Sequence, residues 1–192
     1  GNVCSFLTRP EPQAEEMAPA LARLVTSPYR HVAQNAALAL ARIGPPARLA
    51  APALTDALRH DSGLVRVNAA LALAKVDRQI ATALKVLVAE LKHPVREVRG
   101  TAAMHLVELG EEARPALPEL RKMLNDPLDL PRVHAAKAVW KLDHRPEEVV
   151  PALISLLEYS IRMTGAMDVL AEIGPPAKTA IPILRKAAKT RW

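Results

Sequence analysis

A six-residue motif returns along this chain every 33 residues. It reads V-A-Q-N-A-A at 32–37, V-R-V-N-A-A at 65–70, V-R-G-T-A-A at 98–103 and P-R-V-H-A-A at 131–136. The last step of the pattern, from Leu142 to Ile173, is 31 residues long. A fixed period of a few tens of residues indicates tandem structural repeats, so we derive the fold from one repeat unit.

Each unit is predicted to contain two helices. In the second helix, apolar side chains at Val65, Ala69, Leu73 and Val76 follow one another at spacings of three and four, which places them on one helical face. A pair of short helices cannot bury its apolar face alone, so neighbouring units must stack. The sequence therefore predicts an all-α protein, an α-solenoid of five helix pairs followed by a C-terminal single helix.

The repeat columns also predict the domain organisation. Residues 1–16 are predicted to form an N-terminal extension or irregular cap, and residues 17–192 the repeat domain. The five units are expected at about 17–46, 47–79, 80–112, 113–145 and 146–176, with a half unit at 177–192. The unpaired half unit favours a chain that is cut from something longer.

Composition excludes several classes of protein. Half of the 192 residues are hydrophobic, yet no apolar run is long enough to cross a bilayer, and the single cysteine excludes an internal disulfide framework. The formal net charge is +6, but the last fifteen residues carry five basic groups and no acidic group. The rest of the chain is electrically mixed. No membrane partner is expected, and the compartment stays open, with the cytoplasm favoured.

The recurring segments P-A-L, V-R-x-x-A-A-x-A-L and I-G-P-P-A resemble HEAT repeats, and most of all the short bacterial HEAT-like repeats of the phycobilisome-lyase type. The paired aromatics of tetratricopeptide repeats and the T-P-L-H turn of ankyrin repeats are absent from the sequence. The resemblance implies a protein-binding adaptor surface, which is the commonest role in this family. It also leaves open a nucleic-acid-binding domain, as in DNA alkylation repair, and a bilin-lyase-like subunit.

The second helices supply the candidate binding surface. Apolar residues at Leu38, Leu71 and Met104 share one repeat column that usually tolerates polar residues, and they are expected to form an exposed strip. Trp140 is the expected anchor for a bound peptide or helix. In the nucleic-acid alternative, Trp140 would stack on a base with the help of basic residues nearby. Basic residues beside the strip are expected to orient the partner: Arg42, Lys75, Lys137 and Lys141. The alternative is that neighbouring second helices pack tightly and bury the strip.

Arginines at Arg66, Arg99 and Arg132 share a column at the start of second helices. Two roles fit them. They could form an anion-binding ladder, or each guanidinium could cap carbonyls of the preceding turn or pair with an aspartate. The structural role is favoured.

Motifs for catalysis and metal binding are missing from the sequence. It contains no H-E-x-x-H, no G-x-S-x-G and no glycine-rich phosphate loop. His60 and His93 share one repeat column next to a turn, which favours a role in the turn over metal binding. We therefore expect a non-enzymatic protein without a metal or cofactor.

Overall fold

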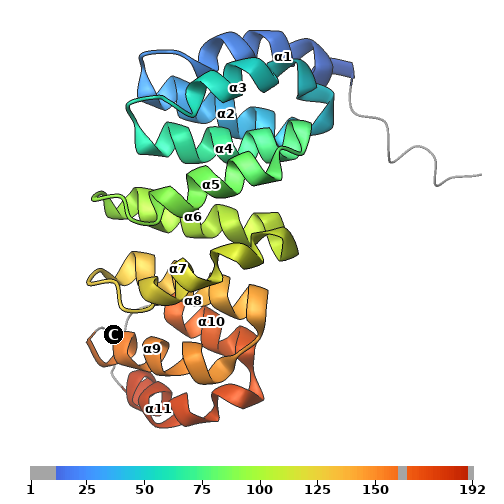
Figure 1. Cartoon of the computed structure of the whole chain (residues 1–192). Coiled ribbons are helices and arrows are strands. Elements are labelled where there is room, and N and C mark those ends of the chain that lie inside the picture. The colour runs from blue at the N-terminus through green and yellow to red at the C-terminus, as the bar shows by residue number, and fades with distance from the viewer. Residues whose placement is uncertain (1–11, 160–163, 190–192) are drawn as a thin grey trace, which may run out of the picture. The chain divides into compact units, whose positions relative to one another are not determined.

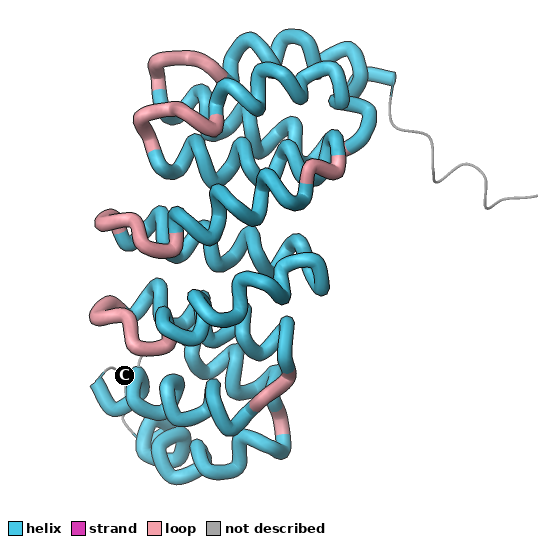
Figure 2. The backbone as a smooth tube through the Cα atoms, viewed as in Figure 1, coloured by secondary structure: helices cyan, strands magenta, loops and turns pink. Residues whose placement is uncertain are grey.

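A computed structural model describes residues 12–159 and 164–189, and in these residues the chain is helical without a β-strand (Figure 2). Residues 1–11 of the predicted extension lie outside the described part. The first helix already begins at Pro12, inside the segment that was predicted to be an extension or cap.

The helices follow one another in pairs (Figure 1). The first helices of the pairs are α1 (Pro12–Val25), α3 (Ala51–Ala57), α5 (Ile80–Glu90), α7 (Leu117–Met123) and α9 (Pro146–Tyr159). The second helices are α2 (Arg30–Ile43), α4 (Gly63–Asp77), α6 (Arg96–Leu109), α8 (Asp129–Asp143) and α10 (Thr164–Ile173). A single helix, α11 (Ile181–Lys189), follows them. Short 3-10 segments lead into α3, α7 and α11, namely η2 (Pro45–Ala50), η3 (Gly110–Ala116) and η4 (Pro175–Ala180). The predicted all-α repeat architecture of five pairs and a single helix is confirmed.

The chain divides into two compact units. These are Gly1–Leu87 and Val88–Trp192, so the boundary between them lies within α5. In the N-terminal unit, the second helices α2 and α4 pack against each other, and so do the first helices α1 and α3. In the C-terminal unit, α8 packs against α6 and α10, while α11 packs against α9. Within each unit, helices of the same kind are therefore neighbours, as stacked repeats require.

The repeat columns become the core. Leu54, Leu87, Leu120 and Leu153 occupy one column of the first helices, and all four are 0% exposed. The second helices contribute a column of buried alanines, Ala36, Ala69, Ala102 and Ala135. Because alanine has a small side chain, it lets neighbouring helices approach closely.

The ends of the second helices depend on one repeat position. Where this position holds Gly44, the backbone takes a φ of +71°, which glycine adopts without strain, and the helix stops. Asp77 and Asp143 occupy the same column, and there the helix runs through the aspartate. It ends one residue later, at Arg78 or His144, each in the left-handed conformation with a φ of 52°. An aspartate in this column thus lengthens the second helix by one residue.

A polar side chain closes the turn between the two helices of a pair. Ser27, His60, His93 and Asp126 lie 33 residues apart, and each accepts a hydrogen bond from the backbone N–H two residues further on, at 2.9 to 3.2 Å. In the N-terminal unit, Nε2 of His60 also lies 3.3 Å from the carbonyl oxygen of Ser27 in the preceding turn. Since Nδ1 of His60 accepts, Nε2 carries the proton and donates. The predicted turn role of His60 and His93 is confirmed.

Candidate partner-binding groove

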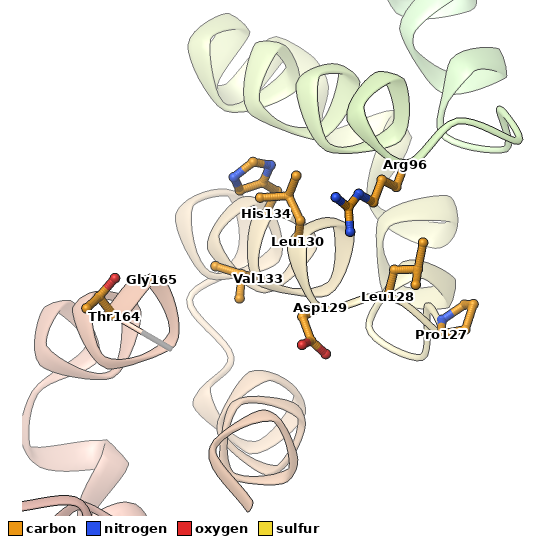
Figure 3. A pocket seen from close by; sticks show the side chains of 9 residues that line it. All are labelled: Arg96, Pro127, Leu128, Asp129, Leu130, Val133, His134, Thr164 and Gly165. Carbon is orange, nitrogen blue, oxygen red and sulfur yellow. The ribbon is translucent and has the colours of Figure 1, made fainter. Parts of the chain in front are cut away.

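A cavity lies in the C-terminal unit, at the start of the second helices α6, α8 and α10 (Figure 3). Its volume is about 550 Å³. The walls are formed by Arg96 of α6, by Pro127, Leu128, Asp129, Leu130, Val133 and His134 on or just before α8, and by Thr164 and Gly165 of α10. Cavities of this size, lined mainly by apolar side chains with a few polar groups, are typical of ligand sites.

A second cavity of about 210 Å³ lies between α6 and α8. Its lining consists of Met104, Val107, Glu108, His134 and Lys137. His134 belongs to the walls of both cavities, so the two adjoin at this side chain. We call the two cavities together the α8 groove.

Apolar side chains on the groove are partly open to solvent. Leu128 is 39% exposed, Leu130 is 42% exposed and Met104 is 47% exposed. A partner that covers these leucine and methionine side chains removes apolar surface from water, and this burial stabilises the complex.

The charges on the groove are balanced within each cavity. Arg96 and Asp129 line the larger cavity, while Lys137 and Glu108 line the smaller one. Nε of Arg96 also lies 2.8 Å from Oε1 of the neighbouring Glu97, whose pKa is lowered mainly by this hydrogen bond. The groove is therefore lined by apolar side chains together with equal numbers of cations and anions, so its lining carries no large net charge of one sign.

His134 is held in a confined position. A Cβ atom added to Gly100 of α6 would lie only 2.8 Å from Nδ1 of His134, so the ring occupies space that any other residue at position 100 would fill. Nδ1 is buried and makes no hydrogen bond. Burial lowers the pKa of His134 from its ordinary value of 6.5; the backbone of Gly100 acts in the opposite direction, and the Lys137 cation lowers the pKa further.

Four of the predicted partner-binding residues lie on the second helices of this unit, and the groove contains two of them. Met104 and Lys137 line the smaller cavity. Trp140 is half-buried, and its ring meets His144 edge-on with the ring centroids 5.1 Å apart. Lys141 of α8 forms an ion pair with Glu172 of α10. Trp140 and Lys141 thus have partners within the protein.

The predicted exposed strip is wrong at Leu71, which is 2% exposed. The physical reason is the sequence of α4, where all six residues from Ala69 to Ala74 are apolar and buried, and six successive residues lie all around the helix. A helix that is apolar on every side is buried on every side. Leu38, in the same repeat column on α2, is half-buried.

The two basic residues predicted beside these leucines lie at the ends of their helices. Arg42 is exposed in the last turn of α2, and Lys75 is half-buried in the last turn of α4. Cations in a last turn complement the negative end of the helix dipole.

Arg66 and Arg99 bind the turns that precede their helices. Nη1 of Arg66 donates to the carbonyl oxygens of His60 and Asp61, at 2.8 and 3.1 Å. Nη1 of Arg99 donates likewise to the carbonyl oxygens of His93 and Pro94, at 2.8 and 3.0 Å. These contacts are those of the structural role that the sequence analysis favoured over an anion ladder.

Arg99 makes a further, bidentate contact. Its Nε and Nη2 donate to the two carboxylate oxygens of Asp126 at 2.7 and 2.9 Å, which joins two successive turns of the C-terminal unit. Arg132 differs, because its Nη2 donates to Oγ of Ser155 in α9 at 3.2 Å and its Nε is buried without a hydrogen bond. The three arginines of the column therefore have three different environments.

Sequence reasoning missed the larger cavity. Its exposed leucines, Leu128 and Leu130, stand beside the start of α8, whereas the predicted columns followed the middle of the second helices. The repeat column gives no signal for Leu130, because the same column holds Leu64 as well as His31 and Glu97.

Among the described residues, no cluster of three or more histidine, cysteine, aspartate or glutamate side chains could hold a metal ion. In the same part of the chain, none of the helices combines the length and the apolar character that a membrane span requires.

Comparison with the sequences of curated proteins gives no match. Residues 51–138 match the family model of HEAT repeats, a range that runs from α3 into α8. The match includes Met104, Leu128, Leu130 and His134 of the α8 groove.

Solved structures with similar folds are known. A crystal structure of an engineered protein shares 23% identity with a TM-score of 0.52, covering 85% of this chain and 80% of that one. A designed armadillo repeat protein shares 20% identity with a TM-score of 0.50, covering 91% of this chain and 93% of that one. The complex of CpcE and CpcF of phycocyanin lyase from Nostoc shares 18% identity with a TM-score of 0.42, covering 97% and 100%. The chain is therefore an all-α repeat protein whose residues 51–138 match the family model of HEAT repeats.

Proposed function

We propose that this protein is a non-catalytic binding module that takes a segment of another protein, as a peptide or a helix, into the α8 groove. One observation carries the proposal: two adjoining cavities open beside the exposed apolar side chains of Met104, Leu128 and Leu130. Apolar anchors of a partner that fill such cavities supply most of the binding free energy at an interface.

The charge pattern supports a polypeptide partner. It argues against a nucleic acid, the alternative partner that the sequence analysis left open. Arg96 and Lys137 each share a cavity with an acidic side chain, and Lys141 is paired with Glu172. Phosphate groups bind best where cations are not neutralised by neighbours. Trp140 keeps only part of its ring open for stacking, because it is half-buried.

The binding test uses a displayed library of random peptides selected against the purified protein, with affinities measured by fluorescence anisotropy. Leu130→Asp places a charge in the larger cavity, and we expect it to weaken binding of the selected peptides by about tenfold or more, because a carboxylate there must lose water. Leu49→Asp is the matched control, since Leu49 is an 83% exposed leucine in the N-terminal unit. Equal affinity of the Leu130→Asp variant and the wild type would contradict the proposal.

Salt separates the two classes of partner. Binding through two phosphate contacts weakens about tenfold when salt rises from roughly 0.05 to 0.2 M, whereas apolar binding changes little. We expect the selected peptides to show the weak dependence, and single-stranded oligonucleotides to compete poorly with them. Competition by oligonucleotides that disappears as salt rises would favour the nucleic-acid alternative.

A further inference from the structure

We infer that His134 is the specificity-determining residue of the α8 groove: its neutral ring admits an apolar segment, and protonation of the ring releases that segment. This inference rests on the proposed function. It names what the groove selects and what condition reverses the binding.

The position of His134 is the first support. It is the side chain that both cavities share, so a segment that occupies both must cross the ring. The ring already uses the space that Gly100 leaves on α6, because its Nδ1 lies 2.8 Å from the position that a Cβ of residue 100 would take. Nδ1 is buried and makes no hydrogen bond; the backbone of Gly100 favours a proton on the ring, but burial outweighs it, because the pKa of His134 is lowered overall.

The charged groups around the ring are the second support. On α8 itself these are Asp129 and Lys137, and on α6 they are Arg96 and Glu108. The residues of α10 that line the larger cavity, Thr164 and Gly165, are uncharged. One further titratable group lies close by on α6, since Nδ1 of His105 is 3.4 Å from Oε1 of Glu108.

A protonated His134 would therefore add a third cation to a lining that holds two cations and two anions. Burial and the nearby Lys137 already disfavour the charged ring, and both lower its pKa. An apolar segment laid over the ring would remove more water from it, so the bound state favours the neutral ring more strongly than the free state does.

The direction of the pH dependence follows from linkage. Above the pKa of His134 in the free protein, affinity for an apolar segment is constant. Below that pKa, the competent fraction of the protein falls, and the affinity falls by up to about tenfold for each pH unit. A partner that presented a carboxylate to the ring would show the opposite trend.

The test measures the affinity of peptides selected at about pH 7.5 again at about pH 5. We expect the wild-type protein to bind these peptides more weakly at the lower pH, by about two- to tenfold. In His134→Phe the ring is apolar and does not titrate, so the ratio of the two affinities should be close to one, whatever the affinity itself. His31→Gln, a change of an exposed histidine in the N-terminal unit, should keep the wild-type ratio. Circular dichroism at both pH values checks that each variant is folded, and His134→Gln serves if His134→Phe is not.

The outcomes separate the inference from the proposed function. Peptides that bind the wild type with the same affinity at both pH values, or more tightly at the lower one, would overturn the inference and leave the binding role intact. If His134→Phe lost as much peptide affinity at the lower pH as the wild type does, the pH dependence would come from another group, such as His105. That result would also overturn the inference. If no peptide is selected, the proposed function fails. The inference then depends on whether the NMR signal of the Met104 methyl group shifts with the titration of His134 in the free protein, and an unchanged signal would overturn it.

Discussion

Leu71 and Met104 occupy the same position in successive repeats, yet Leu71 is 2% exposed and Met104 is 47% exposed. The difference lies in the helices that carry them. α4 in the N-terminal unit is apolar on all sides, whereas α6 in the C-terminal unit begins with Arg96 and Glu97 and carries Glu108 near its end. The repeat position therefore determines where a side chain lies in the fold. The rest of its helix determines whether it belongs to the core or to a surface that can bind a partner.

The same contrast applies to the arginine column, where we expect the largest effect. Arg99→Ala would leave Asp126, whose side chain is 7% exposed, without its bidentate partner, and should cost about 3–5 kcal/mol of unfolding free energy. Arg66→Ala removes hydrogen bonds to carbonyl groups in the N-terminal unit and should cost about 1–2 kcal/mol. Urea denaturation followed by circular dichroism measures both. Equal losses would contradict the expectation that the contact with Asp126 makes Arg99 the more important of the two.

The next largest effect on the free energy of unfolding is expected from alanine substitutions at Leu71 and Met104. Leu71→Ala removes a buried side chain and should cost about 2–5 kcal/mol, whereas Met104→Ala should cost less than about 1 kcal/mol. The same denaturation experiment measures both variants. In the peptide-binding assay the order should reverse, and Met104→Ala should weaken peptide affinity more than Leu71→Ala does. A Met104→Ala variant that is as destabilised as Leu71→Ala would place Met104 in the core.

Gly100 and Val67 share another column, and only the glycine leaves room for a histidine ring on the next second helix. In Gly100→Ala the new methyl group must push the His134 ring toward solvent. The better helix propensity of alanine, about 1 kcal/mol, offsets part of the cost. We expect the pKa of His134 to rise toward 6.5 as its burial decreases, which an NMR titration of the ring protons measures. An unchanged pKa would mean that burial by α6 is not what lowers it.

His134 also makes folding stability depend on pH. Its pKa is lowered in the folded state, so the unfolded chain binds the proton more readily. The stability that His134 contributes is complete above the ordinary pKa of 6.5 and is lost as the pH falls toward the lowered pKa. Thermal unfolding of the wild type and of His134→Phe at several pH values should show this loss in the wild type alone. Parallel pH profiles of the two proteins would contradict the prediction.

The smallest effect is expected at Lys141. Its ion pair with Glu172 lies at the surface, with the lysine side chain 43% exposed, so Lys141→Ala should change the unfolding free energy by less than about 1 kcal/mol. A matched Lys137→Ala variant should leave stability equally unchanged but alter binding, because Lys137 lines the groove. A loss of binding in Lys141→Ala that equals the loss in Lys137→Ala would extend the interface beyond the groove.

The sequence predicted the fold well because repeat columns record packing. The leucine column is fully buried at its four inner members, Leu54, Leu87, Leu120 and Leu153, and the turn role of His60 and His93 follows from their shared column. Helix ends were predicted less well. The sequence alone does not show that a helix continues through Asp77 when glycine is missing.

The binding surface was predicted only in part. Met104 and Lys137 line the groove, but Leu71 is buried, and Arg96 and Leu130 were not expected. A cavity depends on which side chains fail to fill the space between neighbouring helices. That is a property of several repeats together, and the spacing of residues within one repeat does not contain it.

The turn column has a consequence for tracing the ancestry of such repeats. Serine, histidine and aspartate do the same work at 27, 60, 93 and 126, since each offers one lone pair to the amide two residues ahead. An amino-acid exchange matrix scores these letters as dissimilar, although the backbone receives an equivalent acceptor each time. Divergent relatives of this protein should therefore be easier to recognise by matching acceptor chemistry at this position than by matching residue identity.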